Sequence, residues 1–147
     1  IGIEDVELLF SANPGSPTQP ISHIASGGER SRVMLAFKAA LAKRTTVPTI
    51  VLDEIDTGVS GDVATRMAST MREMSSGQQV FSVTHLAQVA ASGNHHLEVS
   101  KKTNNSEAIT QAVYLATQER NEAIATMLSG SQVSEEARAA AKVLLSR

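Results

Sequence analysis

The stretch TIVLDE at residues 49–54 decides the fold class of this chain of 147 residues. Its first four residues form a continuous apolar run, which is typical of a buried strand in a parallel sheet. Pro48 precedes the run, and the acidic residues Asp53 and Glu54 end it. The stretch therefore predicts a short buried strand with two carboxylates at its carboxyl end.

Helical patterns flank this strand on both sides. Before it, Val33, Phe37 and Leu41 recur every four residues with Met34 between them, which predicts the apolar face of a helix over residues 26–43. The other expected elements are a strand at 3–10, a proline-rich loop at 11–22, helices at 63–74, 86–91, 118–128 and 134–145, a strand at 79–84, and strands at 95–101 and 108–114 joined by a turn. Because helices alternate with short apolar strands, we expect an α/β fold with a parallel-sheet core flanked by helices.

Composition argues against several classes of protein. Hydrophobic residues make up 41% of the chain and charged residues 19%, with a net charge of −2, so we expect a folded, soluble domain and no strongly basic nucleic-acid surface. The absence of cysteine removes disulfides, thiol catalysis and cysteine-ligated zinc. No apolar run approaches the roughly 18 residues of a membrane span, and no signal peptide is recognisable. The first residue is Ile1, which fits a piece of a longer protein.

The sequence Ser26-Gly27-Gly28-Glu29 opens the first expected helix. It fits a capping box, in which Ser26 accepts a hydrogen bond from the amide of Glu29 and the Glu29 side chain reaches back. It also fits an anion site, because two glycines expose backbone amides at a helix N-terminus. Both interpretations remain open at this point.

Two further groups follow apolar strands. Asp53 and Glu54 could cap or turn the chain, but an aspartate at a strand end can hold a hydrated Mg²⁺ and a glutamate can activate a water molecule. Thr84-His85 follows the second strand. A lone histidine is more often structural, although ligands in open α/β sheets bind at the carboxyl ends of strands. The adjacent His95 and His96 should point to opposite faces of a strand, so we expect no metal site there.

The triplet Asp56-Thr57-Gly58 also occurs at the active sites of aspartic proteases. Those enzymes are all-β, and the helical patterns on both sides of the triplet argue against this interpretation.

Taken in order, residues 24–29, 49–54, 56–61 and 84–86 resemble the second half of an ABC-type ATPase head. They match its signature motif, Walker B pair, D-loop and switch histidine. Within that family the sequence is most similar to a bacterial DNA-repair branch related to the structural-maintenance-of-chromosomes (SMC) ATPases, and SANPG at 11–15 and MLSG at 127–130 extend the similarity over nearly the whole chain.

The resemblance implies a role for each motif. Asp53 would hold Mg²⁺ through water, Glu54 would be the general base and His85 would contact the γ-phosphate of ATP. A second set would act between two heads. The signature residues would contact the γ-phosphate of ATP held by the partner head; they are Ser26, Gly27, Gly28 and Glu29. Asp56 and Ser60 of the D-loop would lie along the interface between the heads.

The resemblance also implies a missing half. A phosphate-binding loop requires the pattern G-x-x-x-x-G-K-[ST], and no glycine in the chain is followed by lysine. Residues 1–147 are therefore expected to be the C-terminal part of the head, with the P-loop segment and coiled coil elsewhere. The family further implies an ATP-sandwiched homodimer, contact with DNA by the full-length protein in double-strand break repair, no membrane partner, and a cytoplasmic, nucleoid-associated location. A non-catalytic dimerisation or interaction module is the alternative.

Overall fold

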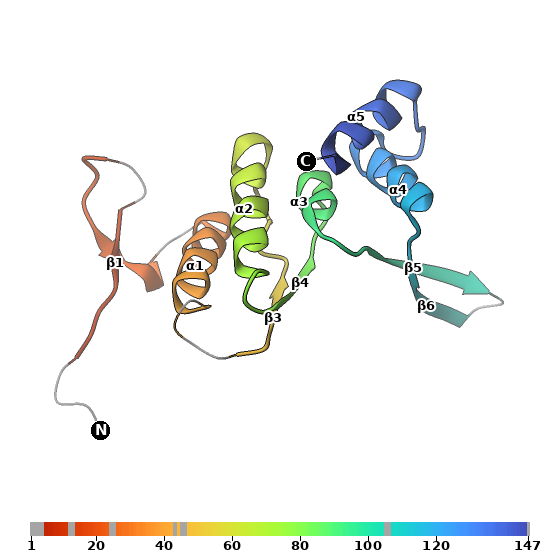
Figure 1. Ribbon diagram of the computed structural model, residues 1–147. Helices are drawn as coiled ribbons and strands as arrows, with labels where there is room; N and C mark the ends of the chain where they lie inside the picture. The colour runs from red at the N-terminus through yellow and green to blue at the C-terminus, as the bar shows by residue number, and fades with distance from the viewer. Residues whose placement is uncertain are drawn as a thin grey trace.

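The computed structural model describes residues 5–11, 14–23, 26–42, 44, 47–104 and 107–146 (Figure 1). The remaining positions, among them Ile24 and Ala25 before the signature motif, lie outside the described residues. The elements in chain order are β1 (Leu9–Phe10), β2 (Gln19–Pro20), a 3-10 turn (Ile21–His23), α1 (Gly27–Ala42), β3 (Thr49–Asp53), α2 (Gly61–Met74), β4 (Gln79–Val83), α3 (Ala87–Ser92), β5 (Leu97–Asn104), β6 (Glu107–Tyr114), α4 (Thr117–Ser129) and α5 (Glu135–Leu145).

Strands β3 and β4 form the parallel sheet that the sequence predicts. They pair in register from Thr49 opposite Gln79 to Asp53 opposite Val83, and α2 connects them. Because parallel strands end at the same edge, the residues that follow Asp53 and Val83 start side by side. This edge therefore receives two of the three groups that the sequence singles out.

The β3/β4 sheet is covered on one face and open on the other. Leu52 is buried and Ile50 and Val80 pack with it against the methionine-rich face of α2, which contributes Met67, Met71 and Met74. On the opposite face Val51 is 57% exposed, Phe81 44% and Val83 55%. The continuous apolar run suggested a strand buried on both faces, and this expectation is wrong for the described part of the chain because nothing in it covers the second face.

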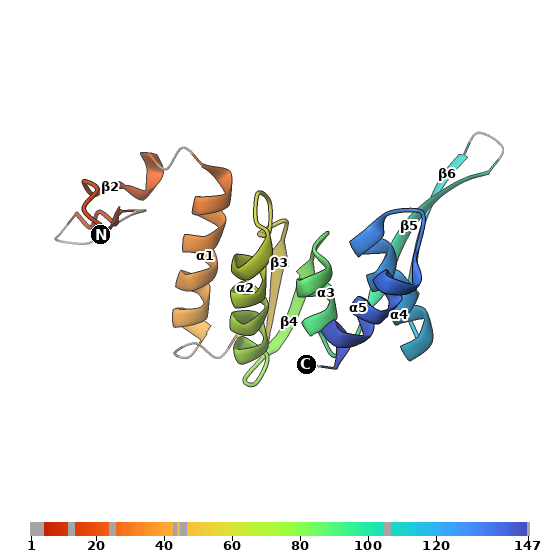
Figure 2. The same ribbon diagram turned by 90° about the horizontal axis from the view of Figure 1, so that it is seen from above.

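Helix α1 follows its predicted range but buries a different stripe. Leu35, Ala39 and Ala42 pack against the α2 cluster, whereas Met34, Phe37 and Leu41 of the predicted apolar face are exposed. The helix carries two apolar stripes, and α2 covers only the one made of smaller side chains. Helices α1 and α2 lie side by side (Figure 2). A helix that is apolar on more than one side is typical of a position between two layers of a larger fold.

Helix α3 joins the two apolar clusters of the chain. Val89 belongs to the cluster with α2, and Ala87 and Ala91 belong to the cluster with α4 and α5. Arg120 of α4 donates to carbonyl oxygens at the end of α3, namely those of Ala90 at 3.3 Å, Ala91 at 2.9 Å, Gly93, and Asn94 at 3.3 Å. The final carbonyls of a helix lack helical partners, so Arg120 satisfies them and locks α3 to α4. Burial, followed by the nearby Arg72, lowers the pKa of Arg120.

Two peripheral segments differ from expectation. The strand expected at residues 3–10 is reduced to β1, which pairs antiparallel with the equally short β2; residues 3 and 4 lie outside the described part. Beyond this pair the Ile21 amide donates to the Leu8 carbonyl at 2.9 Å, where the chain enters the 3-10 turn. Strands β5 and β6 run further into the expected turn, with Asn104 opposite Glu107. Their hairpin extends away from the helices in both views (Figures 1 and 2).

Candidate functional site

The candidate site lies at the carboxyl edge of the β3/β4 sheet. Asp53 is the exposed last residue of β3, and Thr84 and His85 leave β4 beside it. The turn between Glu54 and Gly61 connects β3 to α2 and carries the D-loop residues. The predicted convergence of the two strand ends is therefore present.

The turn begins with an unusual backbone conformation at Glu54. Its φ of +49° is the only positive φ of a non-glycine residue in the described part of the chain. Such a conformation costs about 1–2 kcal/mol and needs support from its surroundings. Thr57 supplies it, because its amide and its hydroxyl donate to the Glu54 carbonyl at 3.4 Å and 3.0 Å. The turn therefore holds the Glu54 backbone in place at the sheet edge.

Asp56 occupies an interior position in this turn. Its side chain is 1% exposed, and Oδ2 accepts hydrogen bonds from the Thr84 hydroxyl and from the His85 amide at 3.2 Å. The Leu86 amide donates in turn to Thr84 Oγ1 at 3.0 Å. The Asp56 carboxylate is thus enclosed by Thr84 and His85 of its own chain. The place along an interface between heads that the resemblance implies for Asp56 stays a prediction. Ser60, the other D-loop residue singled out, is exposed, and its side chain makes no capping bond to α2.

The signature motif reaches the same edge through the start of α1. Ser26 Oγ accepts from the Glu29 amide at 3.4 Å, which is the first half of the expected capping box. Gly28 is buried, and a Cβ atom there would lie 2.9 Å from the Thr57 carbonyl oxygen and 3.2 Å from Arg32 Nη1. Thus the first turn of α1 packs directly on the turn that carries Asp56. All three groups singled out in the sequence meet at one edge.

This close approach predicts different effects for two adjacent glycines. Gly28→Ala should destabilise the protein by about 1–3 kcal/mol, because the new methyl group must displace backbone atoms. Gly27→Ala is the matched control: a Cβ at Gly27 meets nothing within 4 Å, so the change should be neutral or stabilise by up to about 1 kcal/mol. Thermal denaturation of the two full-length variants measures the difference, and equal midpoints would contradict the contact.

The strand-end carboxylates suit a hydrated magnesium ion. Mg²⁺ keeps several waters and binds through one or two carboxylates together with substrate phosphates, and the exposed Asp53 can supply such a ligand. In the described residues, no group of three or more histidine or acidic side chains could form a metal cage by itself. None of the described helices is long and apolar enough to cross a membrane.

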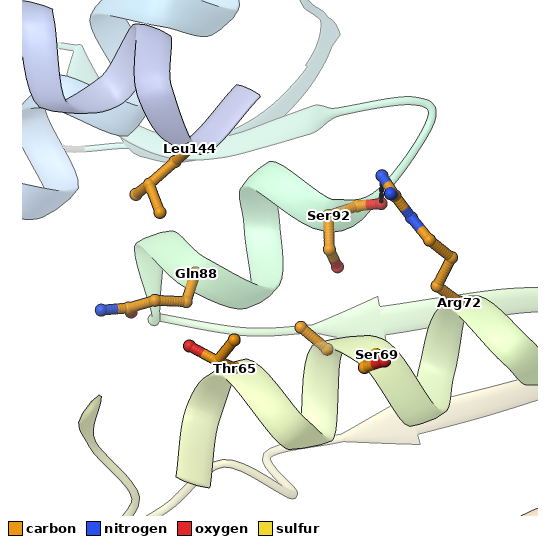
Figure 3. A pocket seen from close by; sticks show the side chains of 7 residues that line it. Thr65, Ser69, Arg72, Gln88, Ser92 and Leu144 are labelled. Carbon is orange, nitrogen blue, oxygen red and sulfur yellow. Dashed lines mark hydrogen bonds between the residues drawn. The ribbon is translucent and has the colours of Figure 1, made fainter. Parts of the chain in front are cut away.

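A small pocket lies away from this edge, between α2, α3 and the end of α5 (Figure 3). Its volume is about 150 Å³, and its lining residues are Thr65, Ala68, Ser69, Arg72, Gln88, Ser92 and Leu144. The Arg72 guanidinium donates to the Ser92 carbonyl at 3.1 Å across it. No residue singled out in the sequence lines this pocket, so it is separate from the candidate site.

The histidine pair before β5 makes its contacts at the base of the β5/β6 hairpin. The His95 ring lies 5.7 Å from the Tyr114 ring, centroid to centroid. His96 is half-buried; burial, and secondarily Arg120, lower its pKa, while Glu98 acts in the opposite direction. These contacts give the pair a structural environment at the base of the hairpin.

Comparison with curated proteins identifies relatives that are similar to this chain over nearly its whole length. It is 43% identical to the DNA repair protein RecN of Halalkalibacterium halodurans, over 98% of this chain and 26% of that protein. The RecN of Xylella fastidiosa strain 9a5c is 48% identical with the same coverage. The chain belongs to the RecN family. It spans about a quarter of the length of these RecN relatives. No protein-family model matches the chain.

Solved structures identify the fold of this RecN-family chain. An SMC head domain with coiled coil and joint from Pyrococcus yayanosii superposes with a TM-score of 0.64 and 24% identity, over 75% of this chain and 20% of that one. A structure from work on ATP-driven dimerisation and DNA-stimulated activation of SMC ATPases gives 0.60 and 22%, over 80% of this chain and 70% of that one. The fold is that of an SMC-type ATPase head, which excludes the all-β protease interpretation of Asp56-Thr57-Gly58.

Proposed function

We propose that this chain is the C-terminal part of an ATP-hydrolysing head in a RecN-type protein that acts in DNA double-strand break repair and recombination. One observation carries the proposal: the strand-end carboxylates, the Thr84-His85 pair and the first turn of α1 meet at one edge of a parallel sheet, through Asp56 and Gly28. Ligands in open α/β sheets bind at such an edge.

Three residues of this edge suit hydrolysis of a phosphoanhydride. Asp53 would hold Mg²⁺ through water, and the ion would neutralise charge on the phosphates. Glu54 would accept a proton from the water that attacks the γ-phosphate, and the fixed turn around it supports that role because a general base must be held within reach of its substrate. His85 would contact the γ-phosphate through its exposed imidazole.

The signature motif would serve the nucleotide of a second head. Ser26 and Gly27 are exposed, and the first amides of a helix have no helical partners, so the start of α1 can receive a phosphate. In the proposed homodimer, two heads enclose ATP between them. Glu29 and the buried Gly28 would shape this end of the helix, and Ser60 would lie along the interface between heads.

The exposed apolar surfaces support the proposal that another segment of the head packs against this chain. The outer face of the sheet carries Val51, Phe81 and Val83, and α1 presents its second stripe with Phe37 and Leu41. Exposed apolar areas of this kind mark surfaces that another segment covers. We propose that an N-terminal segment with the P-loop covers them, that a coiled coil separates it from this part, and that the cytoplasmic protein contacts DNA as a whole.

ATP turnover by two proteins tests the proposal. The full-length protein should hydrolyse ATP, whereas the isolated chain should show no turnover above background, because catalysis of phosphoryl transfer depends on positioning that half a site lacks. Robust turnover by the isolated chain, abolished by Glu54→Gln, would contradict the division into halves. A full-length protein that neither binds nor hydrolyses ATP would favour the non-catalytic interaction module.

A further inference from the structure

The Asp56 carboxylate has one satisfied and one unsatisfied oxygen. Oδ2 accepts from the Thr84 hydroxyl and the His85 amide, as described above. Among the described residues Oδ1 is buried without a hydrogen-bond partner, and His85 Nδ1 lies 3.5 Å from it. A buried carboxylate oxygen without a partner is costly, so a small rotation of the imidazole that shortens this distance is favoured.

The geometry determines which imidazole nitrogen faces outward. A carboxylate oxygen can only accept a hydrogen bond, so Nδ1 must carry a hydrogen when it faces Oδ1. The second nitrogen, Nε2, then lies on the far side of a ring that is 67% exposed. The same buried side chain holds the His85 backbone through its amide, and the rotation would let it hold the His85 ring through Nδ1 as well.

We infer that Asp56 is the positioning residue of His85, fixing the tautomer and the direction of its imidazole from inside the head. The inference deepens the proposed function and rests on it for the identity of the ligand, a nucleotide phosphate at Nε2. It gives Asp56 a role within its own head, in addition to the place along the interface between heads that the resemblance implies for the D-loop. A carboxylate that orients a histidine in this way sets which nitrogen meets the substrate.

The inferred contact also connects the other parts of the site. Asp56 lies two residues after Glu54, whose strained backbone the same turn supports, and Thr57 carries the carbonyl oxygen against which Gly28 packs. Anchoring Asp56 in Thr84 and His85 therefore holds the general base, the switch histidine and the start of α1 in one arrangement. Loss of the anchor should impair the chemical step more than the binding of ATP.

The first test is kinetic and uses the full-length protein. Asp56→Asn keeps the size of the side chain and one acceptor oxygen. The Thr84 hydroxyl and the His85 amide should continue to donate their hydrogen bonds to that oxygen. Its NH₂ group then faces Nδ1 and favours the opposite tautomer. We expect kcat for ATP to fall by about 10- to 100-fold with KM unchanged. Asp62→Asn, the same change at an exposed position in the first turn of α2, should leave kcat at the wild-type value. An unchanged kcat in Asp56→Asn would overturn the inference.

The second test reads the tautomer directly and needs no hydrolysis. Solid-state ¹⁵N NMR of the full-length protein with labelled histidine shows which nitrogen carries hydrogen, and loss of a signal in His85→Gln identifies His85. In the wild type Nδ1 should carry hydrogen, and in Asp56→Asn the neutral ring should carry it on Nε2 instead. A wild-type Nδ1 without hydrogen overturns the inference even if the variant does not fold. The expected tautomer in a protein without ATPase activity would contradict the proposed function alone.

Discussion

Glu54→Gln in the full-length protein should lower the rate of ATP hydrolysis by about 10²–10⁴-fold while ATP binding survives. The change removes the proton acceptor but keeps the length and shape of the side chain. Both residues face the same backbone penalty at φ +49°, so the turn supported by Thr57 should remain intact. ATP-bound head dimers should consequently accumulate, which size-exclusion chromatography with ATP can detect.

The matched control for this prediction is Glu73→Gln. Glu73 is exposed in the last full turn of α2. Glu73→Gln is therefore the same chemical change as Glu54→Gln, made away from the sheet edge. It should hydrolyse ATP at the wild-type rate. Normal hydrolysis by Glu54→Gln would show that Glu54 is not the general base, and failure of that variant to bind ATP would assign the residue a structural role.

Ser26→Arg in the full-length protein should abolish ATP hydrolysis with the fold intact. Ser26 is exposed at the start of α1, and its hydroxyl accepts the capping bond from the Glu29 amide, so its loss should cost about 1 kcal/mol of stability. A long charged side chain at this position would keep the second head and its nucleotide away. The expected loss of activity is therefore far larger than the loss of stability.

Another helix cap provides the control for this variant. Ser134 Oγ accepts from the Ala137 amide at 3.2 Å at the start of α5, which is the same local role in a helix away from the sheet edge. Ser134→Arg should lose similar stability and keep its ATPase activity. Equal loss of activity in both variants would trace the effect of Ser26→Arg to folding.

The sequence predicts the sheet edge well because the signal is local. Apolar runs bounded by polar residues locate β3 and β4, and the helix between them makes their pairing parallel, so their carboxyl ends must meet. The positions of Asp53 and His85 follow from this rule. The capping bond at Ser26 is equally local and was also predictable.

The interior of the turn was not predictable, because it depends on contacts between distant segments. Asp56 follows a strand end in a stretch of polar and small residues, which is the pattern of an exposed turn. Its burial arises from Thr84 and His85, 28 and 29 residues later. In α1 the spacing of apolar residues is compatible with two different buried faces. The face with Leu35 is buried because α2 packs against the small side chains of Ala39 and Ala42 beside it. Spacing alone could not choose between the stripes.

Mixing two inactive full-length proteins tests most directly whether this edge is half of a shared ATP site. One partner is Ser26→Arg, and the other carries a substitution of the lysine in the proposed P-loop. In a mixed dimer one site would pair an intact P-loop with an intact signature motif. Random mixing should therefore restore about a quarter of the wild-type ATPase rate, since half of the dimers are mixed and each has one working site. A rate that stays at background, while mass spectrometry shows that mixed dimers form, would contradict the shared site.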